Sequence, residues 1–196
     1  MQITAPPLFP RGRPRNGSTN DYTVPGVSWV GETSRTLTSG RMYYEQMLVE
    51  TPQTISDFVL LNVITADAGT PGLLRVGIYS ADLNWQPEAL IVDAGAFDTS
   101  ATGQKTLTLG TPQALAPGRY LLANLSNNST VVLRAYTGNV PGGNGIVPAL
   151  TANAIRTSMF VAQAYGALPS SPPAWTGNGN GNTPFVHTVF CNVSAP

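Results

Sequence analysis

Residues 74–80 read LRVGIYS, and residues 105–109 read KTLTL. In the first run Leu74, Val76 and Ile78 alternate with Arg, Gly and Tyr, and the second run alternates in the same way. Successive side chains of a strand point to opposite faces, so this period of two is typical of a strand with one buried face. The two runs therefore predict β-structure.

Runs of the same kind, rich in Val, Ile, Leu, Thr and Tyr and bounded by turn residues, recur along the chain. They are Met42–Glu50, Ile55–Thr65, Ala89–Val92, Arg119–Leu125, Thr130–Tyr136, Ser158–Ala164 and Phe185–Val193. With the two runs above they give roughly nine strands, with turns at the spacing of a sandwich and no amphipathic helix between them. The sequence predicts an all-β fold, an antiparallel, jelly-roll-like β-sandwich.

The composition favours packing against neighbours. Charged residues make up 10% and hydrophobic residues 42% of the 196 residues. One domain is expected at this length, with a polar but weakly charged surface. The formal net charge is zero, and no apolar run is long enough to span a bilayer, so neither nucleic acid nor membrane is an expected partner. The first residues lack the apolar region of a signal peptide, so no secretion address is expected.

The beginning of the chain is rich in proline and poor in aliphatic side chains, which favours an extended arm over residues 1–40 ahead of a sandwich head over residues 41–196. The arm carries Arg11, Arg13 and Arg15. No aromatic stacking partner lies near these arginines, so acidic patches on a neighbouring subunit are their expected partners, ahead of nucleic acid phosphates.

Two segments, 137–153 and 166–184, are longer than ordinary hairpin connections. Long loops on a rigid sandwich often carry function. In the second loop Trp175 follows Pro172 and Pro173, which predicts that part of this loop docks on another surface. The long loops are otherwise expected to be free for a neighbour or a host receptor.

Residues with catalytic potential are few. His187 and Cys191 alternate on one face of the last predicted strand, where a separation of four residues corresponds to about 14 Å, too far for proton transfer. They are interpreted as a core histidine and an inert buried thiol. The known nucleophile, nucleotide and metal motifs are missing from the sequence.

The acidic residues are scattered. Asp93 and Asp98 flank a predicted turn and are interpreted as turn formers, not as an acid and base pair. Asp82 and Asn84 lack the spacing of a calcium loop and also predict a turn. The sequence therefore predicts no catalytic, cofactor-binding or metal-binding residues, and no enzyme.

Residues 74–123 carry a series of short motifs. They are R-x-G-I-Y at Arg75–Tyr79, D-A-G at Asp93–Gly95, D-T-S at Asp98–Ser100 and L-x-P-G-x-Y at Leu115–Tyr120. This stretch, about a quarter of the chain, resembles a β-sandwich module of tailed-bacteriophage virion proteins, namely tail fibre, adsorption and decoration proteins. Its P-G pair predicts a type II turn with a positive φ at Gly118.

The resemblance implies a non-enzymatic virion structural protein, located in the virion, whose arm docks to other virion proteins. The chain lacks a heptad or collagen-like shaft, which favours a short component: a tail-tip, spike or fibre-associated subunit, or alternatively a capsid decoration (cement) protein. A homotrimer is expected. The rival hypothesis is a carbohydrate-binding module, with Trp85 and Trp175 as ligand contacts and a host-surface glycan as ligand.

Overall fold

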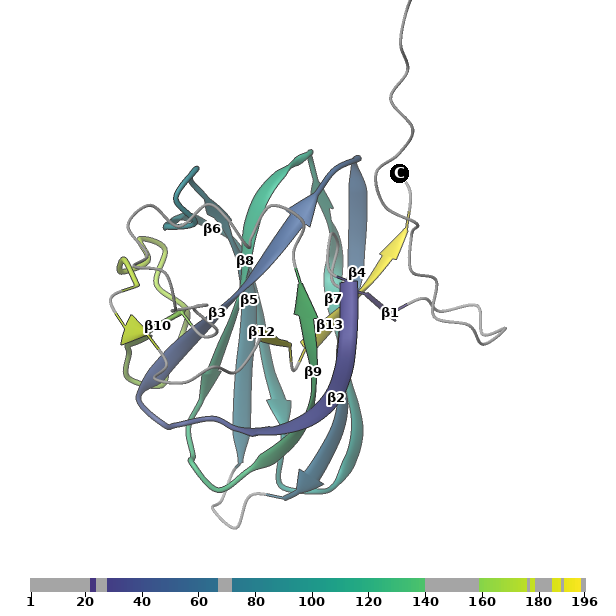
Figure 1. The fold of residues 1–196 in the computed structure, drawn as a ribbon, viewed down its shortest axis with the longest axis vertical. Coiled ribbons are helices and arrows are strands. Elements are labelled where there is room, and N and C mark those ends of the chain that lie inside the picture. The colour runs from purple at the N-terminus through teal and green to yellow at the C-terminus, as the bar shows by residue number, and fades with distance from the viewer. Residues whose placement is uncertain are drawn as a thin grey trace, which may run out of the picture.

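The computed structural model describes residues 22–23, 28–66, 72–139, 159–175, 177–178, 185–187 and 189–194. All regular elements within these residues are strands, and they form two antiparallel sheets that pack face to face (Figure 1). The predicted all-β antiparallel sandwich is confirmed.

The seven-stranded sheet contains the two ends of the described chain. Its strands are β1 (Tyr22–Thr23), β2 (Ser28–Thr36), β4 (Gln53–Thr65), β7 (Gly103–Leu115), β9 (Val132–Asn139), β12 (Phe185–His187) and β13 (Val189–Ser194). Those of the six-stranded sheet are β3 (Arg41–Val49), β5 (Leu73–Ala81), β6 (Pro87–Asp98), β8 (Gly118–Ser126), β10 (Met159–Ala162) and β11 (Gly177–Asn178).

The eight consecutive strands β2 to β9 have the connectivity of a jelly roll. One sheet has the order β2-β9-β4-β7, and the other has the order β3-β8-β5-β6. Most connections therefore cross from one sheet to the other, which interlocks the two layers in the manner of two Greek keys.

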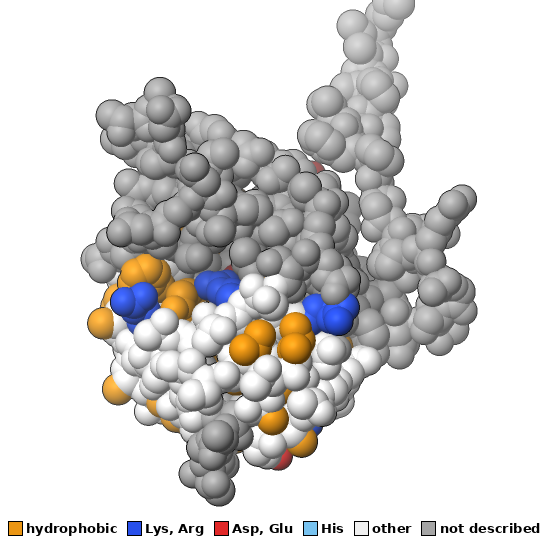
Figure 2. Space-filling view, turned by 60° about the horizontal axis from the view of Figure 1, so that its bottom comes forward, with side chains coloured by type: hydrophobic (Ala, Val, Ile, Leu, Met, Phe, Trp, Pro, Cys, Tyr) orange, Lys and Arg blue, Asp and Glu red, His pale blue; other side chains and the backbone are white. Residues whose placement is uncertain are grey.

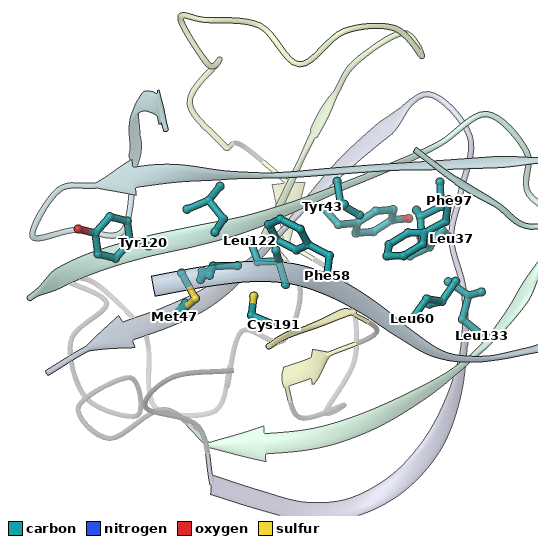
Figure 3. Packing of buried hydrophobic residues seen from close by; sticks show 14 of the residues in the cluster. Leu37, Tyr43, Met47, Phe58, Leu60, Phe97, Tyr120, Leu122, Leu133 and Cys191 are labelled. Atoms are coloured by element: carbon teal, nitrogen blue, oxygen red, sulfur yellow. The ribbon is translucent and has the colours of Figure 1, made fainter. Parts of the chain in front are cut away.

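The main core lies between the sheets (Figure 3). Leu74, Val76 and Ile78 of β5 all point into it, as their alternation predicted. Phe58 and Leu60 of β4 meet them from the opposite sheet. Burial of these side chains supplies the main stabilisation, at about 25 cal/mol for each Å² of apolar surface removed from water.

The predicted boundary of the arm at residue 40 lies too late in the chain, because β2 falls inside it and pairs with β9 over most of its length. The segment SWVGETSRT has few aliphatic residues, so its strand depends on tertiary pairing more than on its own pattern. Arg35 of β2 points toward the interior, where Nη1 lies 3.4 Å from Oε1 of the buried Glu45 and the guanidinium lies over the ring of Tyr43.

The last predicted strand, Phe185–Val193, is in fact two strands that run in opposite directions. β12 is antiparallel to β9, and β13 is antiparallel to β4. Because β9 and β4 pair directly only through Val63 and Thr65 of β4, the C-terminal segment fills the space where they diverge. His187 and Cys191 therefore do not share one continuous strand, and the side chain of His187 lies outside the described residues.

The prediction of a positive φ at Gly118 is wrong. The residue begins β8 in register with Val49, and positive φ values occur in the described glycines at Gly40, Gly95 and Gly103. The turn is held instead by Tyr120, whose hydroxyl donates to the carbonyl oxygen of Ala116 at 2.9 Å. This tyrosine explains the motif L-x-P-G-x-Y, because a buried ring with a bonded hydroxyl fixes the start of the strand.

Gly77 lies in the middle of β5, close to the backbone of β6 and to the side chain of Leu168. A Cβ atom there would lie 2.4 Å from Cδ1 of Leu168 and 2.4 Å from the carbonyl oxygen of Val92. We expect Gly77→Ala to lower the free energy of unfolding by ~1–3 kcal/mol, because the backbone carbonyl of Val92 cannot move aside.

Gly110 of β7 provides the matched control, since a Cβ atom there would meet nothing within 4 Å. Gly110→Ala should change stability by less than ~0.5 kcal/mol or raise it slightly. Urea denaturation of both variants makes the comparison, and equal losses would contradict the close packing at Gly77.

Candidate functional site

The outer face of the six-stranded sheet is covered by residues 163–175, which we call the strap. The strap and the sheet share a second hydrophobic cluster. Its buried members are Met42, Tyr44, Tyr79, Trp85, Leu121, Ala123, Leu125, Met159, Val161 and Leu168. In Figure 1 the strap is the yellow-green trace beside β10 and β3. The six-stranded sheet is thus apolar on both faces, and we call the face under the strap the strap face.

The carboxylate of Asp93 fixes the strap to the sheet. Both of its oxygens accept hydrogen bonds from Arg75, with Nε to Oδ1 at 2.9 Å and Nη2 to Oδ2 at 2.8 Å. Oδ2 also accepts the backbone N–H of Leu168 at 3.0 Å, and Oδ1 accepts that of Gly95 at 3.2 Å. The side-chain hydrogen bonds from Arg75 to Asp93 raise the pKa of Arg75. A charge-assisted pair of this geometry is stronger than a neutral hydrogen bond.

Two buried tyrosines hold the strap through its carbonyl groups. Tyr79 donates its hydroxyl to the carbonyl oxygen of Pro169 at 2.9 Å, and Tyr44 donates to that of Pro173 at 3.3 Å. Their rings meet edge to face, with centroids 5.9 Å apart. Burial raises the pKa of both hydroxyls, so they stay protonated and remain donors. Each of these two prolines of the strap therefore has a tyrosine hydroxyl as the donor to its carbonyl.

Trp85 and Trp175, named from the sequence as candidate ligand contacts, are brought together. The indole N–H of Trp175 donates to the carbonyl oxygen of Trp85 at 2.9 Å. Trp85 has a φ of 62° and is 3% exposed, and the guanidinium of Arg119 lies 5.4 Å from its ring centroid. Trp85 is thus an anchor for the strap, and its ring offers no free face to a ligand.

Two of the four motifs behind the bacteriophage resemblance, R-x-G-I-Y and D-A-G, meet at this place. Arg75, Gly77 and Tyr79 lie on the same face of β5, and each contacts the strap or the carboxylate that holds it. Asp93 and Gly95 of the D-A-G motif complete the arrangement. Part of the loop 166–184 was predicted to dock on some surface, and its residues 166–175 do dock, on the six-stranded sheet of the same chain. The expectation that this loop is free for a neighbour or a receptor is wrong for these residues.

The remaining acidic candidates are turn formers, as predicted. Asp98 accepts the backbone N–H of Ser100, and the hydrogen bonds from Ser100 lower the pKa of Asp98. Asp82 accepts the backbone N–H groups of Asn84 and Gln86 at 2.7 and 2.8 Å. Across the described part of the chain, no group of three potential metal ligands was found.

Cys191 is completely buried in the main core. Removal of the thiol from water raises its pKa, and the nearby charge of Glu45 raises it further. Because the thiolate is the reactive form, this cysteine is inert in the folded protein. The prediction of a buried, structural thiol is confirmed.

The described surface is weakly charged. On the face in Figure 2, the described surface consists mostly of backbone and uncharged polar side chains, with a few basic and hydrophobic groups among them. Arg11, Arg13 and Arg15 lie outside the described residues, as do residues 140–153 of the first long loop. No apolar helix of membrane-spanning length occurs in the described ranges.

Comparison of the chain with protein-family models, with curated proteins and with solved structures found no match.

The first test of the strap is Asp93→Ala. The substitution removes the acceptor for Arg75 and Leu168, so the strap should detach more often and chymotrypsin should cleave after Tyr165 at least ~10-fold faster. The free energy of unfolding should fall by about 2–4 kcal/mol, since bonds to a charged group are worth more than neutral ones.

Asp98→Ala is the matched control, because Asp98 bonds within its own exposed turn. It should leave the cleavage rate at Tyr165 unchanged. If both variants are cleaved at the rate of the unchanged protein, Asp93 does not hold the strap.

The second test concerns Cys191. Ellman's reagent should label the thiol only as fast as the protein unfolds, and labelling should become rapid in denaturing urea, because the group is buried. Rapid labelling of the native protein at pH 8 would mean that the core opens at the C-terminal strands.

Proposed function

We propose that this protein is a non-enzymatic structural component of a bacteriophage virion, a tail-tip, spike or fibre-associated subunit that docks through its N-terminal arm. The observation that carries the proposal is the jelly roll in which two of the recognised motifs, R-x-G-I-Y and D-A-G, fasten a strap across the outer face of the six-stranded sheet. Jelly rolls of this connectivity recur in viral capsid proteins and in lectins. The fold alone does not assign a function, so the proposal also relies on the sequence motifs.

The use of the polar side chains supports assembly over catalysis. Asp93, Asp98 and Asp82 each bond to a neighbouring turn, strand or strap, and Cys191 is sealed in the core. A weakly charged surface adds little desolvation cost when subunits pack together. Association as a homotrimer inside the particle fits both features.

The carbohydrate-binding alternative is not favoured by a specific observation. It required Trp85 and Trp175 as platforms for a sugar ring, and Trp85 is 3% exposed while Trp175 gives its N–H to the backbone of Trp85. A capsid decoration protein remains the second candidate within the virion class, since the same head and arm serve either position.

Deletion of residues 1–20 tests the role of the arm. The truncated chain should still fold, because it keeps every described strand of the two sheets, but it should be lost from particles when it replaces the full chain. Quantitative blotting of purified particles measures its occupancy, and antibody labelling in electron micrographs distinguishes tail from capsid. Normal occupancy of the truncated chain would contradict docking through the arm.

A further inference from the structure

The end of the strap has a recognisable sequence, Ser171-Pro-Pro-Ala-Trp175. The strap face receives it through two directed bonds, from the Tyr44 hydroxyl to the carbonyl oxygen of Pro173 and from the Trp175 indole to the carbonyl oxygen of Trp85. Aromatic surfaces that donate to the carbonyl groups of a proline-rich segment are a general mode of peptide recognition. The strap face is therefore built as a receptor for a short segment with two prolines and an aromatic end.

The chain contains a second segment of this kind. The sequence has two Pro-Pro pairs, and the other lies in the arm, in Ala5-Pro-Pro-Leu-Phe9. In both segments a small residue precedes the prolines, and an aliphatic and then an aromatic residue follow them. The aliphatic position tolerates the larger leucine, because its counterpart Ala174 in the strap is exposed.

We propose that residues 5–9 of one copy bind the strap face of a second copy, at the position that residues 171–175 occupy within a single chain. This inference rests on the proposed function, and it names a second copy of this chain as the partner of the arm. Thirteen positions separate Phe9 from Tyr22, the first described residue, and an extended chain of that length spans about 45 Å. The arm is thus long enough to leave its own head and reach a neighbour.

Two differences between the strap and the arm decide which of them binds. Phe9 has no indole N–H, so the arm cannot make the bond that Trp175 makes to Trp85. The strap is also attached to the same head, which gives it a high effective concentration. An isolated chain therefore keeps its strap face closed, and the arm competes only where assembly holds neighbouring copies together. This arrangement prevents the free subunits from joining prematurely.

The test uses a fluorescently labelled peptide of residues 3–12, ITAPPLFPRG, and the full-length chain. Trp175→Phe gives the strap the same aromatic end as the arm and removes one hydrogen bond, so the peptide should bind this variant about 5-fold more tightly than the unchanged chain. A Phe9→Trp peptide should bind both proteins about 5-fold more tightly than the natural peptide. On binding, it should increase chymotrypsin cleavage after Trp175, because it displaces residues 171–175.

A peptide with Phe9→Ala is the control and should bind at least ~10-fold more weakly. Trp175→Phe keeps a large ring in the cluster, so a folded variant is expected, and its melting temperature verifies this. Equal affinity of the unchanged and Trp175→Phe chains for the peptide, equal affinity of the natural and Phe9→Ala peptides, or no binding at all would overturn the inference. If the peptide fails while deletion of residues 1–20 still removes the chain from particles, the arm docks on another virion protein and the proposed function stands.

Discussion

The six-stranded sheet carries apolar side chains on both faces, and this constraint governs much of the rest of the structure. The seven-stranded sheet covers the inner face, but the outer face with Tyr44 and Tyr79 would meet water without the strap. The strap is held by tyrosine hydroxyls that donate to its carbonyls and by the carboxylate of Asp93, which accepts its N–H at Leu168. Asp93 must in turn be oriented, which Arg75 does from the neighbouring strand.

The same constraint explains Gly77, where any side chain would push the strap off the sheet. The motif residues of β5 and β6 are separate in the sequence, but together they hold the strap over the outer face of the six-stranded sheet. Such an arrangement has a structural purpose, and it does not by itself assign a function. This agrees with the general rule that fold and function are assigned separately.

The sequence predicts the strands well where aliphatic residues alternate, as in β5 and β7, because periodicity follows directly from the geometry of a strand. It does not predict β2, which is held by its pairing with β9. The reversal between His187 and Val189 is missed for the same kind of reason. The space that this segment fills is created by strands far away in the sequence.

The candidate site was predicted in part. Proline and tryptophan in the second loop correctly indicate docking, because burial of their apolar side chains is favourable. The burial of Trp85 could not be predicted from the sequence. It goes with a left-handed backbone conformation, with a φ of 62°, that no sequence pattern indicates. Asp93 was interpreted only as a turn former. Its bonds to Arg75 and to the strap were missed, because their partners lie 18 and 75 residues away in the sequence.

The strap is an integral part of the fold, held by Asp93, and hydrogen exchange at the backbone N–H of Leu168 tests this most directly. The exchange is measured by NMR on the full-length chain. This amide bonds to Oδ2 of Asp93, and its exchange should be slowed by at least ~100-fold relative to an unstructured peptide, since the strap must open before water reaches it. Exchange of the Leu168 amide at the rate of an unstructured peptide would contradict the account.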